Sequence, residues 1–292
     1  MADKALIARA PDGRELTFAE WGDPAGYPVF YLHGTPESRL SRYPDEGLIR
    51  SARTRMVTYD RPGYGGSDRH RGRTIAACAD DVAAIAHALG ITRFSVAGGS
   101  GGGPHALAVA ALLGDRVHRA ACIVGVAPYT ALGEEFFAGM DPQNVTEFGW
   151  ALQGEERLAA ELDGLAKQKV RNAAAGVALL HDHFDLPEAD RAVMARADFA
   201  EVTRQSIVEA FRNGPAGWVD DDLALVMPWG FDPAAITVPT QVWYASNDVL
   251  VPPRHGEWIA AAVPGAIVRR TDLGHMGDPD ADLVELLGWL TA

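Results

Sequence analysis

The chain of 292 residues has few cysteines, an excess of acidic over basic residues, and no long apolar run. Its two cysteines, Cys78 and Cys122, are too few for a disulfide framework and do not have the spacing of a metal site. Both lie in apolar stretches, which favours buried thiols in a reducing compartment. The sequence therefore predicts no disulfide and no metal centre.

The chain has 26 Lys and Arg residues and 39 Asp and Glu residues, which give a formal net charge of −13. This balance argues against nucleic acid or an anionic membrane as a partner, because both bind basic patches. No stretch approaches 18 uninterrupted apolar residues, and the first residues show no basic segment followed by an apolar one. We expect a cytoplasmic protein that acts on a small molecule, and the oligomeric state stays open.

Hydrophobic residues make up 48% of the chain and charged residues 22%, as in ordinary globular enzymes. The N-terminal part predicts an antiparallel hairpin, and short apolar runs then alternate with helical patterns. This alternation is typical of a doubly wound, mostly parallel sheet. Strands are expected at 6–10, 15–21, 29–32, 56–59, 94–97, 120–126, 240–244 and 266–271, and helices at 75–89, 106–113, 254–262 and 281–290.

The alternation stops for about a hundred residues, 128–233, which we interpret as a helical insertion. Helices are expected at 159–170, 189–197 and 199–211. His181, His183 and Asp185 alternate at every second position, so on a helix they would diverge rather than bind one metal ion. Asp220-Asp221-Asp222 is predicted to be a capping or solvated acidic turn. The aromatic and methionine side chains that could line a pocket here are Phe136, Phe137, Met140, Phe148, Trp150, Phe184, Trp218, Met227 and Trp229.

One serine stands in a glycine cluster between a predicted strand and a predicted helix. Gly98-Gly99-Ser100-Gly101-Gly102 fits the G-x-S-x-G pattern, in which a sharp turn exposes the serine hydroxyl above the sheet. The glycines are needed because side chains two residues on either side would collide. The turn also brings backbone N–H groups to a helix N-terminus, where negative charge is favoured. Ser100 is therefore a candidate nucleophile.

Two other interpretations of this cluster stay open. It could be an ordinary glycine-rich turn. Gly101, Gly103 and Ala106 also match G-x-G-x-x-A, the fingerprint of dinucleotide binding. That fingerprint expects an acidic residue after the next strand, and Gly125-Val126-Ala127 provides none. The sequence gives no other sign of a cofactor.

Candidate partners for Ser100 follow the last two predicted strands. A serine hydroxyl needs an adjacent base and an orienting carboxylate. Asp248 and His275 each stand at the end of a strand, in the chain order Ser, Asp, His that this architecture uses. His255 is the alternative base. We expect His105 to point away from the serine, His33 to hydrogen-bond its own loop, and Asp60 and Arg61 to fix a loop.

The chain resembles the α/β-hydrolase superfamily over essentially its full length. The motifs that carry the resemblance are His33-Gly34-Thr35-Pro36, Asp60-Arg61-Pro62-Gly63-Tyr64-Gly65-Gly66-Ser67, Gly98-Gly99-Ser100-Gly101-Gly102, Asn247-Asp248-Val249-Leu250-Val251-Pro252 and Gly274-His275. The resemblance implies an eight-stranded, mostly parallel sheet with a helical cap after the sixth strand. We therefore expect a core of residues 1–127 and 234–292 and a cap of residues 128–233.

The resemblance also implies a role for each matching residue. Ser100 would be the nucleophile, His275 the general base and Asp248 the orienting acid. The backbone N–H groups of Thr35 and Gly101 would form the oxyanion hole. We expect the substrate pocket to include Phe137, Trp218 and Val249.

The expected activity is cleavage of an ester or related acyl bond of a small, largely apolar substrate through an acyl-enzyme. Serine rather than aspartate at position 100 disfavours epoxide hydrolase and haloalkane dehalogenase activity. Gly98-Gly99-Ser100 also resembles the elbow of proline iminopeptidases, although Gly101 replaces the bulky aromatic common there. Three alternatives therefore stay open: such an aminopeptidase, a carbon–carbon bond hydrolase acting on a diketone, and a ligand-binding member with little turnover. An aminopeptidase would bind the substrate amine with cap acids, for which the candidates are Glu134, Glu135, Glu155 and Glu156.

Overall fold

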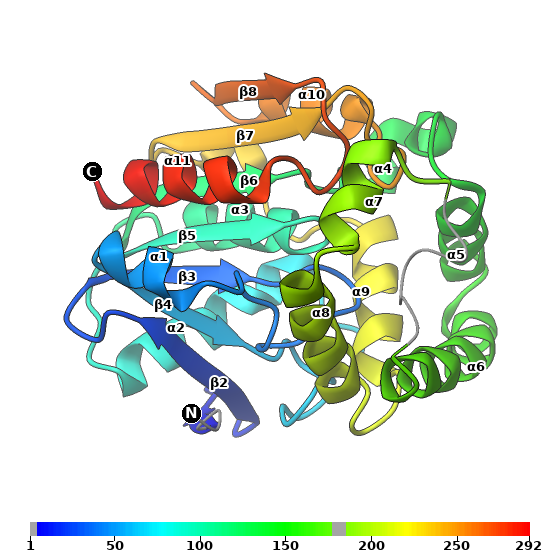
Figure 1. Cartoon of the computed structure of the whole chain (residues 1–292), viewed down its shortest axis with the longest axis horizontal. Helices are drawn as coiled ribbons and strands as arrows, with labels where there is room; N and C mark the ends of the chain where they lie inside the picture. Colours follow the sequence, from blue (N-terminus) through cyan, green and yellow to red (C-terminus); the bar gives the residue numbers. More distant parts are fainter. Residues whose placement is uncertain (1–4, 177–184) are drawn as a thin grey trace.

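The computed structural model describes residues 5–176 and 185–292, which form one sheet flanked by helices (Figure 1). The sheet has eight strands in the order β1-β2-β4-β3-β5-β6-β7-β8. The strands are β1 Leu6–Arg9, β2 Glu15–Gly22, β3 Tyr27–Leu32, β4 Thr54–Tyr59, β5 Phe94–Gly99, β6 Val117–Ile123, β7 Thr240–Ala245 and β8 Ile267–Thr271.

Strands β1, β2 and β4 pair antiparallel, and every pair from β4 to β8 is parallel. The turn Pro11-Asp12-Gly13-Arg14 joins β1 to β2, so the predicted N-terminal hairpin is confirmed. Because parallel strands all end at one edge, β3, β5, β7 and β8 bring their following loops to the same side of the molecule. The predicted eight-stranded, mostly parallel sheet is confirmed.

Helices cover both faces of the sheet, and each face has its own apolar core. Helices α2 (Cys78–Ala88), α3 (Gly102–Leu112) and α10 (Pro253–Ala262) pack into one core, and α1 (Glu46–Ser51) and α11 (Pro279–Thr291) into the other. Neighbouring residues of a strand serve opposite cores, as period-two geometry requires. In β5, for example, the side chains of Val96 and Ala97 belong to different cores.

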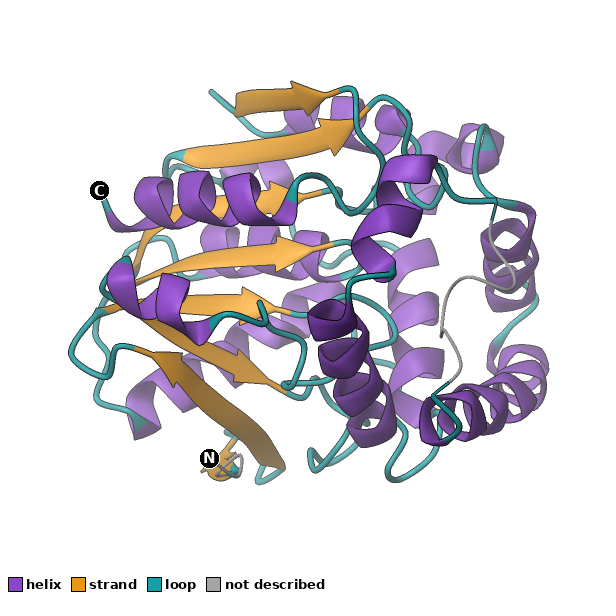
Figure 2. Ribbon diagram, in the orientation of Figure 1, coloured by secondary structure: helices purple, strands orange, loops and turns teal. Residues whose placement is uncertain are grey.

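The chain between β6 and β7 is helical where it is described. Figure 2 shows these helices beyond the arrowheads of the parallel strands, so they stand over the edge where the strand-end loops gather. Within the described residues, no helix is long and apolar enough to cross a membrane. The elements are α4 Tyr129–Leu132, the 3-10 helices Gly133–Phe137 and Pro233–Ala235, α5 Pro142–Leu152, α6 Glu155–Ala174, α7 Glu188–Met194, α8 Ala197–Ala210 and α9 Ala216–Val226.

The prediction for the acidic triplet 220–222 is wrong. These residues lie inside α9 and are buried, with Asp221 and Asp222 fully enclosed, rather than in a capping or solvated turn. The sequence pattern misleads because the cations that pair with Asp221, Arg61 and Arg73, come from distant parts of the chain. Helix α5 was likewise not expected. His181, His183 and Phe184, singled out in the sequence, lie outside the described residues.

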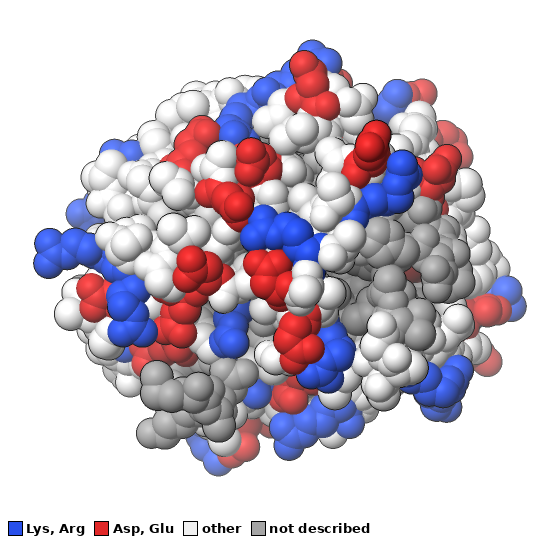
Figure 3. Space-filling view, viewed as in Figure 1, with Lys and Arg blue, Asp and Glu red and all other residues white. Residues whose placement is uncertain are grey.

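Charged side chains of both signs are interspersed on the face shown in Figure 3. Exposed ion pairs of the described residues include Arg196 with Asp198 and Asp280. Exposed pairs of this kind contribute little to stability, typically about 0–1 kcal/mol each. Other ion pairs are buried, such as Arg61 with Asp221 and Arg39 with Asp60.

Candidate active site

Ser100 occupies a sharp turn between β5 and α3. Its φ of +53° is a left-handed conformation that L-residues rarely adopt. The turn is possible because the glycines around it allow close backbone contacts. A Cβ on Gly98 would stand 2.2 Å from the carbonyl oxygen of Gly102, and a Cβ on Gly102 would stand 2.1 Å from that of Leu32. The G-x-S-x-G spacing therefore has a direct steric cause in this structure.

Asp248 and His275 contact each other at the ends of β7 and β8. His275 Nδ1 lies 2.7 Å from Asp248 Oδ2. The other carboxylate oxygen of Asp248 accepts the backbone N–H groups of Leu250 and Val251 at 2.8 and 2.9 Å. These contacts hold the carboxylate against the imidazole. With Nδ1 donating to Asp248, the lone pair of His275 is on Nε2, where it can accept a proton.

Asp190, in helix α7, anchors the loop that carries the histidine. Its two carboxylate oxygens accept the backbone N–H groups of His275 and Met276, each at 2.9 Å. The loop approaches Asp190 so closely that a Cβ on Gly274 would stand 2.2 Å from Oδ2. The Gly274-His275 motif thus has a physical reason for its glycine. Sequence analysis missed Asp190, because nothing local marks a contact across 85 residues.

The pKa of His275 is raised above its ordinary value. Burial acts to lower this pKa, but the charge and hydrogen bond of Asp248 outweigh burial, and the charges of Asp190 and Glu37 act in the same direction. An imidazole of raised pKa is a stronger base, and its protonated form is stabilised by the carboxylate behind it. The site therefore suits a histidine that accepts a proton and later returns it.

Thr35 and Gly101, the predicted oxyanion donors, lie together. The Thr35 nitrogen is 3.4 Å from the position that a Cβ on Gly101 would occupy. The Gly34 carbonyl is held on the opposite side of the peptide by Arg61 Nη2 at 2.9 Å and by His33 Nδ1 at 2.7 Å. Because C=O and N–H of a trans peptide point in opposite directions, the Thr35 N–H is directed away from Arg61. The Gly34 N–H is already used by Glu37, at 2.8 Å.

A buried ion-pair network holds the loop that contains Gly34 and Thr35. Asp221 Oδ2, in α9, accepts hydrogen bonds from Thr35 Oγ1 at 2.7 Å and from Arg61 Nη2 at 2.5 Å. Tyr64 donates to the same oxygen at 2.9 Å, and Arg73 donates to the other at 2.6 Å. The charges of both arginines outweigh burial and hold the pKa of Asp221 well below its usual range. This network, with Asp60 bound to Arg39, confirms that Asp60 and Arg61 fix loops.

The other histidines considered in the sequence are structural. His33 is fully buried between the Gly34 carbonyl and the Arg61 N–H, which confirms the expected loop contact. His255 bridges Ala127 N at 3.1 Å and the carbonyl of residue 136 at 2.9 Å, and burial lowers its pKa to about 4. His105 contacts the Gly101 carbonyl at 2.8 Å, and burial lowers its pKa to about 3. None of the three lines the cavity described next.

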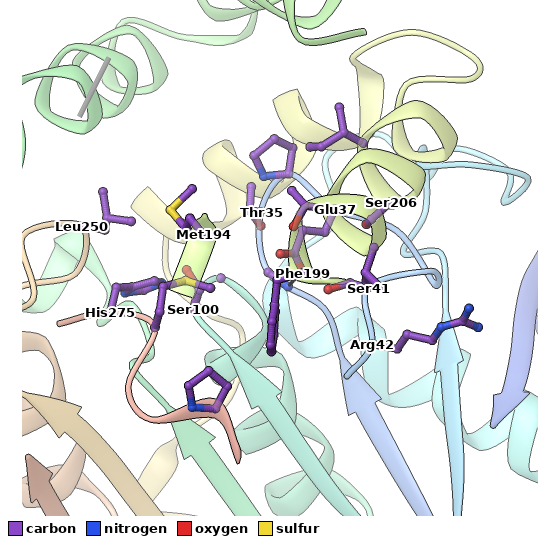
Figure 4. A pocket seen from close by; sticks show the side chains of 18 of the residues that line it. Thr35, Glu37, Ser41, Arg42, Ser100, Met194, Phe199, Ser206, Leu250 and His275 are labelled. Carbon is purple, nitrogen blue, oxygen red and sulfur yellow. Dashed lines mark hydrogen bonds between the residues drawn. The ribbon is translucent and has the colours of Figure 1, made fainter. Parts of the chain in front are cut away.

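Ser100 and His275 open into a cavity of about 890 Å³ between the sheet edge and the helices that follow β6 (Figure 4). This volume is in the range of small-molecule sites. Most of its wall is apolar. Side chains and backbone of the described residues that line it include Thr35, Gly101, Ile123, Val126, Phe148, Met194, Phe199, Trp218, Leu225, Leu250 and Val251.

The three residues predicted to line the substrate pocket lie in different places. Trp218 lines the cavity, but Phe137 and Val249 do not. Phe137 packs instead in an aromatic cluster with Phe136 and Tyr129, at ring-centroid distances of 5.2 and 5.7 Å. Leu250 and Val251 line the wall next to Val249. Within 5–176 and 185–292, no group of three His, Cys, Asp or Glu side chains is placed to hold a metal ion.

The sheet order and the serine at a sharp strand-to-helix turn define the class of α/β enzymes whose sites lie at the strand ends. A family model agrees over most of the length: the "alpha/beta hydrolase fold" matches residues 27–277. The chain belongs to this family.

Curated relatives match only part of the chain. A proline iminopeptidase of Xylella fastidiosa is 37% identical over 106 residues, which cover 34% of this chain and 32% of the relative. A non-heme chloroperoxidase of Streptomyces lividans is 30% identical over 143 residues, covering 48% of this chain and 52% of the relative. The chain therefore aligns with about a third to a half of the length of these relatives.

Solved structures match the whole fold. An enol-lactonase from Burkholderia xenovorans superposes with a TM-score of 0.69 at 20% identity, covering 98% of this chain and 100% of the other. A thermophilic esterase from Thermogutta terrifontis gives 0.66 at 22% identity, covering 99% and 100%. At these identities the likeness establishes the fold alone.

Proposed function

We propose that this protein is a serine hydrolase that cleaves an ester or related acyl bond through an acyl-enzyme. The observation that carries the proposal is the 2.7 Å contact between His275 Nδ1 and Asp248, next to a cavity that Ser100 and His275 both line. In this mechanism His275 Nε2 takes the proton of Ser100 as the hydroxyl oxygen attacks the carbonyl carbon. His275 then gives the proton to the leaving alcohol.

The negative charge on the carbonyl oxygen would be stabilised by the N–H groups of Thr35 and Gly101. The backbone contacts that direct the Thr35 N–H away from Arg61 support this role. One donor of this kind is worth about 10²–10³ in rate. Water, activated by the same His275, then attacks the acyl-enzyme and releases the acid.

We propose that residues 128–233 form a cap over this site. Helices α5 to α9 all contribute residues to the cavity wall, which supports this assignment. The mostly apolar wall favours an apolar ester as the small-molecule substrate. Two buried free thiols, Cys78 and Cys122, support a reducing location such as the cytoplasm.

Proline iminopeptidase activity is the second candidate, supported by the partial match to such an enzyme. The glutamates that the sequence offered for binding an amine argue against it, because none of the four lines the cavity. Glu155 pairs with Arg69 and Arg71, and Glu135 pairs with Arg254. These ion pairs lie outside the cavity wall and occupy Glu155 and Glu135.

A fluorophosphonate probe that labels activated serines tests the proposal. The wild-type protein should be labelled, and Ser100→Ala should not. Loss of the nucleophile should also lower the hydrolysis of p-nitrophenyl esters by about 10⁶. Equal labelling of both proteins, or none of the wild type, would refute the proposal. Faster cleavage of prolyl anilides than of short p-nitrophenyl esters would favour the peptidase.

A further inference from the structure

The wall of the cavity contains a polar cluster that the proposed mechanism does not use. The cluster consists of Glu147 from α5, Lys169 from α6, and Trp218 and Asp222 from α9. All four side chains line the same cavity as Ser100. A substrate attached to Ser100 would therefore share a space with this cluster.

Asp222 is the unusual member. It is 0% exposed, and no N–H or hydroxyl group among the described residues donates to either of its carboxylate oxygens. The side chain that it meets is a second carboxyl group, that of Glu147, which has no proton to donate when ionised. A buried polar group left without a partner costs about 1–3 kcal/mol, and more when charged. The folded protein carries this cost in the cavity wall unless one of the two carboxyl groups is protonated.

The two carboxyl groups are expected to share one proton. Burial and then the charge of Glu147 raise the pKa of Asp222 well above its usual range, because two adjacent carboxylates cannot both ionise easily. Glu147 is the better carboxylate of the two, since its Oε1 accepts the Trp218 indole N–H at 2.8 Å. Lys169, whose Nζ is 5.6 Å from the centre of the Trp218 ring, supplies a nearby positive charge.

We propose that this cluster is a substrate subsite that binds a hydroxyl group distant from the bond that is cleaved. A hydroxyl oxygen can accept the proton of the Asp222 carboxylic acid while its own O–H donates to Glu147. Both acids are then paired, and no charge on the cluster changes. The inference rests on the proposed function, and it adds a substrate class: hydroxylated esters.

Charged groups fit this cluster less well. An ammonium group can only donate, so it offers no acceptor for the proton of Asp222, and it would also be repelled by Lys169. A carboxylate can only accept, and it would be repelled by Glu147. Either ion would in addition lose its hydration in a buried site, which costs several kcal/mol. The neutral hydroxyl avoids both penalties.

A panel of p-nitrophenyl esters tests the subsite on the wild-type protein. The acyl groups are ω-hydroxy, ω-amino and unsubstituted acids of equal chain length, in a series of lengths. At the best length, the ω-hydroxy ester should have a kcat/KM about tenfold above the unsubstituted ester, the value of one hydrogen bond. A wild type with no hydroxyl preference at any length, or with a preference for the ω-amino ester, overturns the proposal.

Variants then show whether the preference for the ω-hydroxy ester depends on Asp222 and Glu147. Asp222→Asn and Glu147→Gln should each bring the ratio of the two kcat/KM values close to one. Asp220→Asn is the matched control, because Asp220 lies on the same helix and pairs with Arg69 without lining the cavity. This control should keep the wild-type ratio. A ratio that survives in both Asp222→Asn and Glu147→Gln assigns the preference elsewhere and refutes the subsite.

Binding measurements distinguish failure of the hydroxyl subsite from failure of the proposed hydrolase function. Calorimetry on Ser100→Ala measures the affinity for the intact esters without turnover. If the wild type hydrolyses none of the esters, the proposed function fails. In that case a tighter affinity for the ω-hydroxy ester still supports the subsite, and equal affinities overturn it as well.

Discussion

Thr35→Val isolates the contact between the helical segment and the proposed oxyanion loop. Valine has nearly the shape of threonine and keeps the backbone N–H, but it lacks the hydroxyl that donates to Asp221 at 2.7 Å and accepts from Arg61 at 3.0 Å. A hydrogen bond to a charged group is worth about 1.5–3 kcal/mol. We expect the free energy of unfolding to fall by an amount in this range.

The kinetic effect should appear in kcat rather than in KM. The oxyanion exists only in the transition state, so a displaced Thr35 N–H weakens an interaction that the bound substrate does not make. Complete loss of one donor costs about 10²–10³ in rate, which sets the upper limit, and a loosened loop should cost about tenfold or more. Steady-state kinetics on a p-nitrophenyl ester and urea denaturation measure both quantities.

Thr35→Ser is the matched control, because it restores the hydroxyl and should return kcat close to the wild-type value. The reasoning is refuted if Thr35→Val leaves kcat unchanged while lowering stability. It is also refuted if serine fails to restore kcat, because the hydroxyl would then not be the group that matters.

Three further predictions concern other parts of the site. Asp190→Asn removes a charge that raises the pKa of His275, so the acid limb of the kcat/KM pH profile should move to lower pH; an unmoved limb would show that Asp190 does not act on the base. Gly98→Ala should destabilise the fold and abolish activity, because its Cβ would stand 2.2 Å from a carbonyl oxygen. Gly288→Ala is the control: this position in α11 has open space around it, so the change should be neutral or stabilising by up to about 1 kcal/mol. Thermal melting measures both effects. Asp221→Asn should lower the free energy of unfolding by about 3–5 kcal/mol in urea titration, since it leaves two buried arginines without their carboxylate; a loss below 1 kcal/mol would contradict this.

The sheet could be predicted from sequence because its signals are local. Apolar runs of strand length alternate with helical periodicity, and the turn around Ser100 has glycines where the backbone leaves no room for a side chain. Asp248 and His275 could be placed by the same logic, since parallel strands end at one edge. Their contact at 2.7 Å follows from the expected strands together with loop contacts, such as that of Asp190, which the sequence does not show.

The helical segment was predicted less well because its important contacts are between distant residues. Asp190 was not recognised, although it binds the backbone of His275 across 85 residues. Asp221 was read as solvated, although Arg61 neutralises it across 160 residues. A carboxylate in a sequence gives no indication of whether a counter-charge will meet it in the fold. The position of Phe137, outside the cavity wall, could not be predicted either, because an aromatic side chain suits a pocket wall and an aromatic cluster equally well.

The two anchoring acids have a consequence for engineering and for divergence within the family. Asp190 and Asp221 come from the segment that roofs the cavity, yet one holds the histidine loop and the other holds the loop of Thr35. Exchanging the whole helical segment is an attractive way to change the substrate range of such enzymes. We expect a transplanted helical segment to abolish the proposed activity unless it carries both carboxylates, so chimaeras should be designed around these two positions.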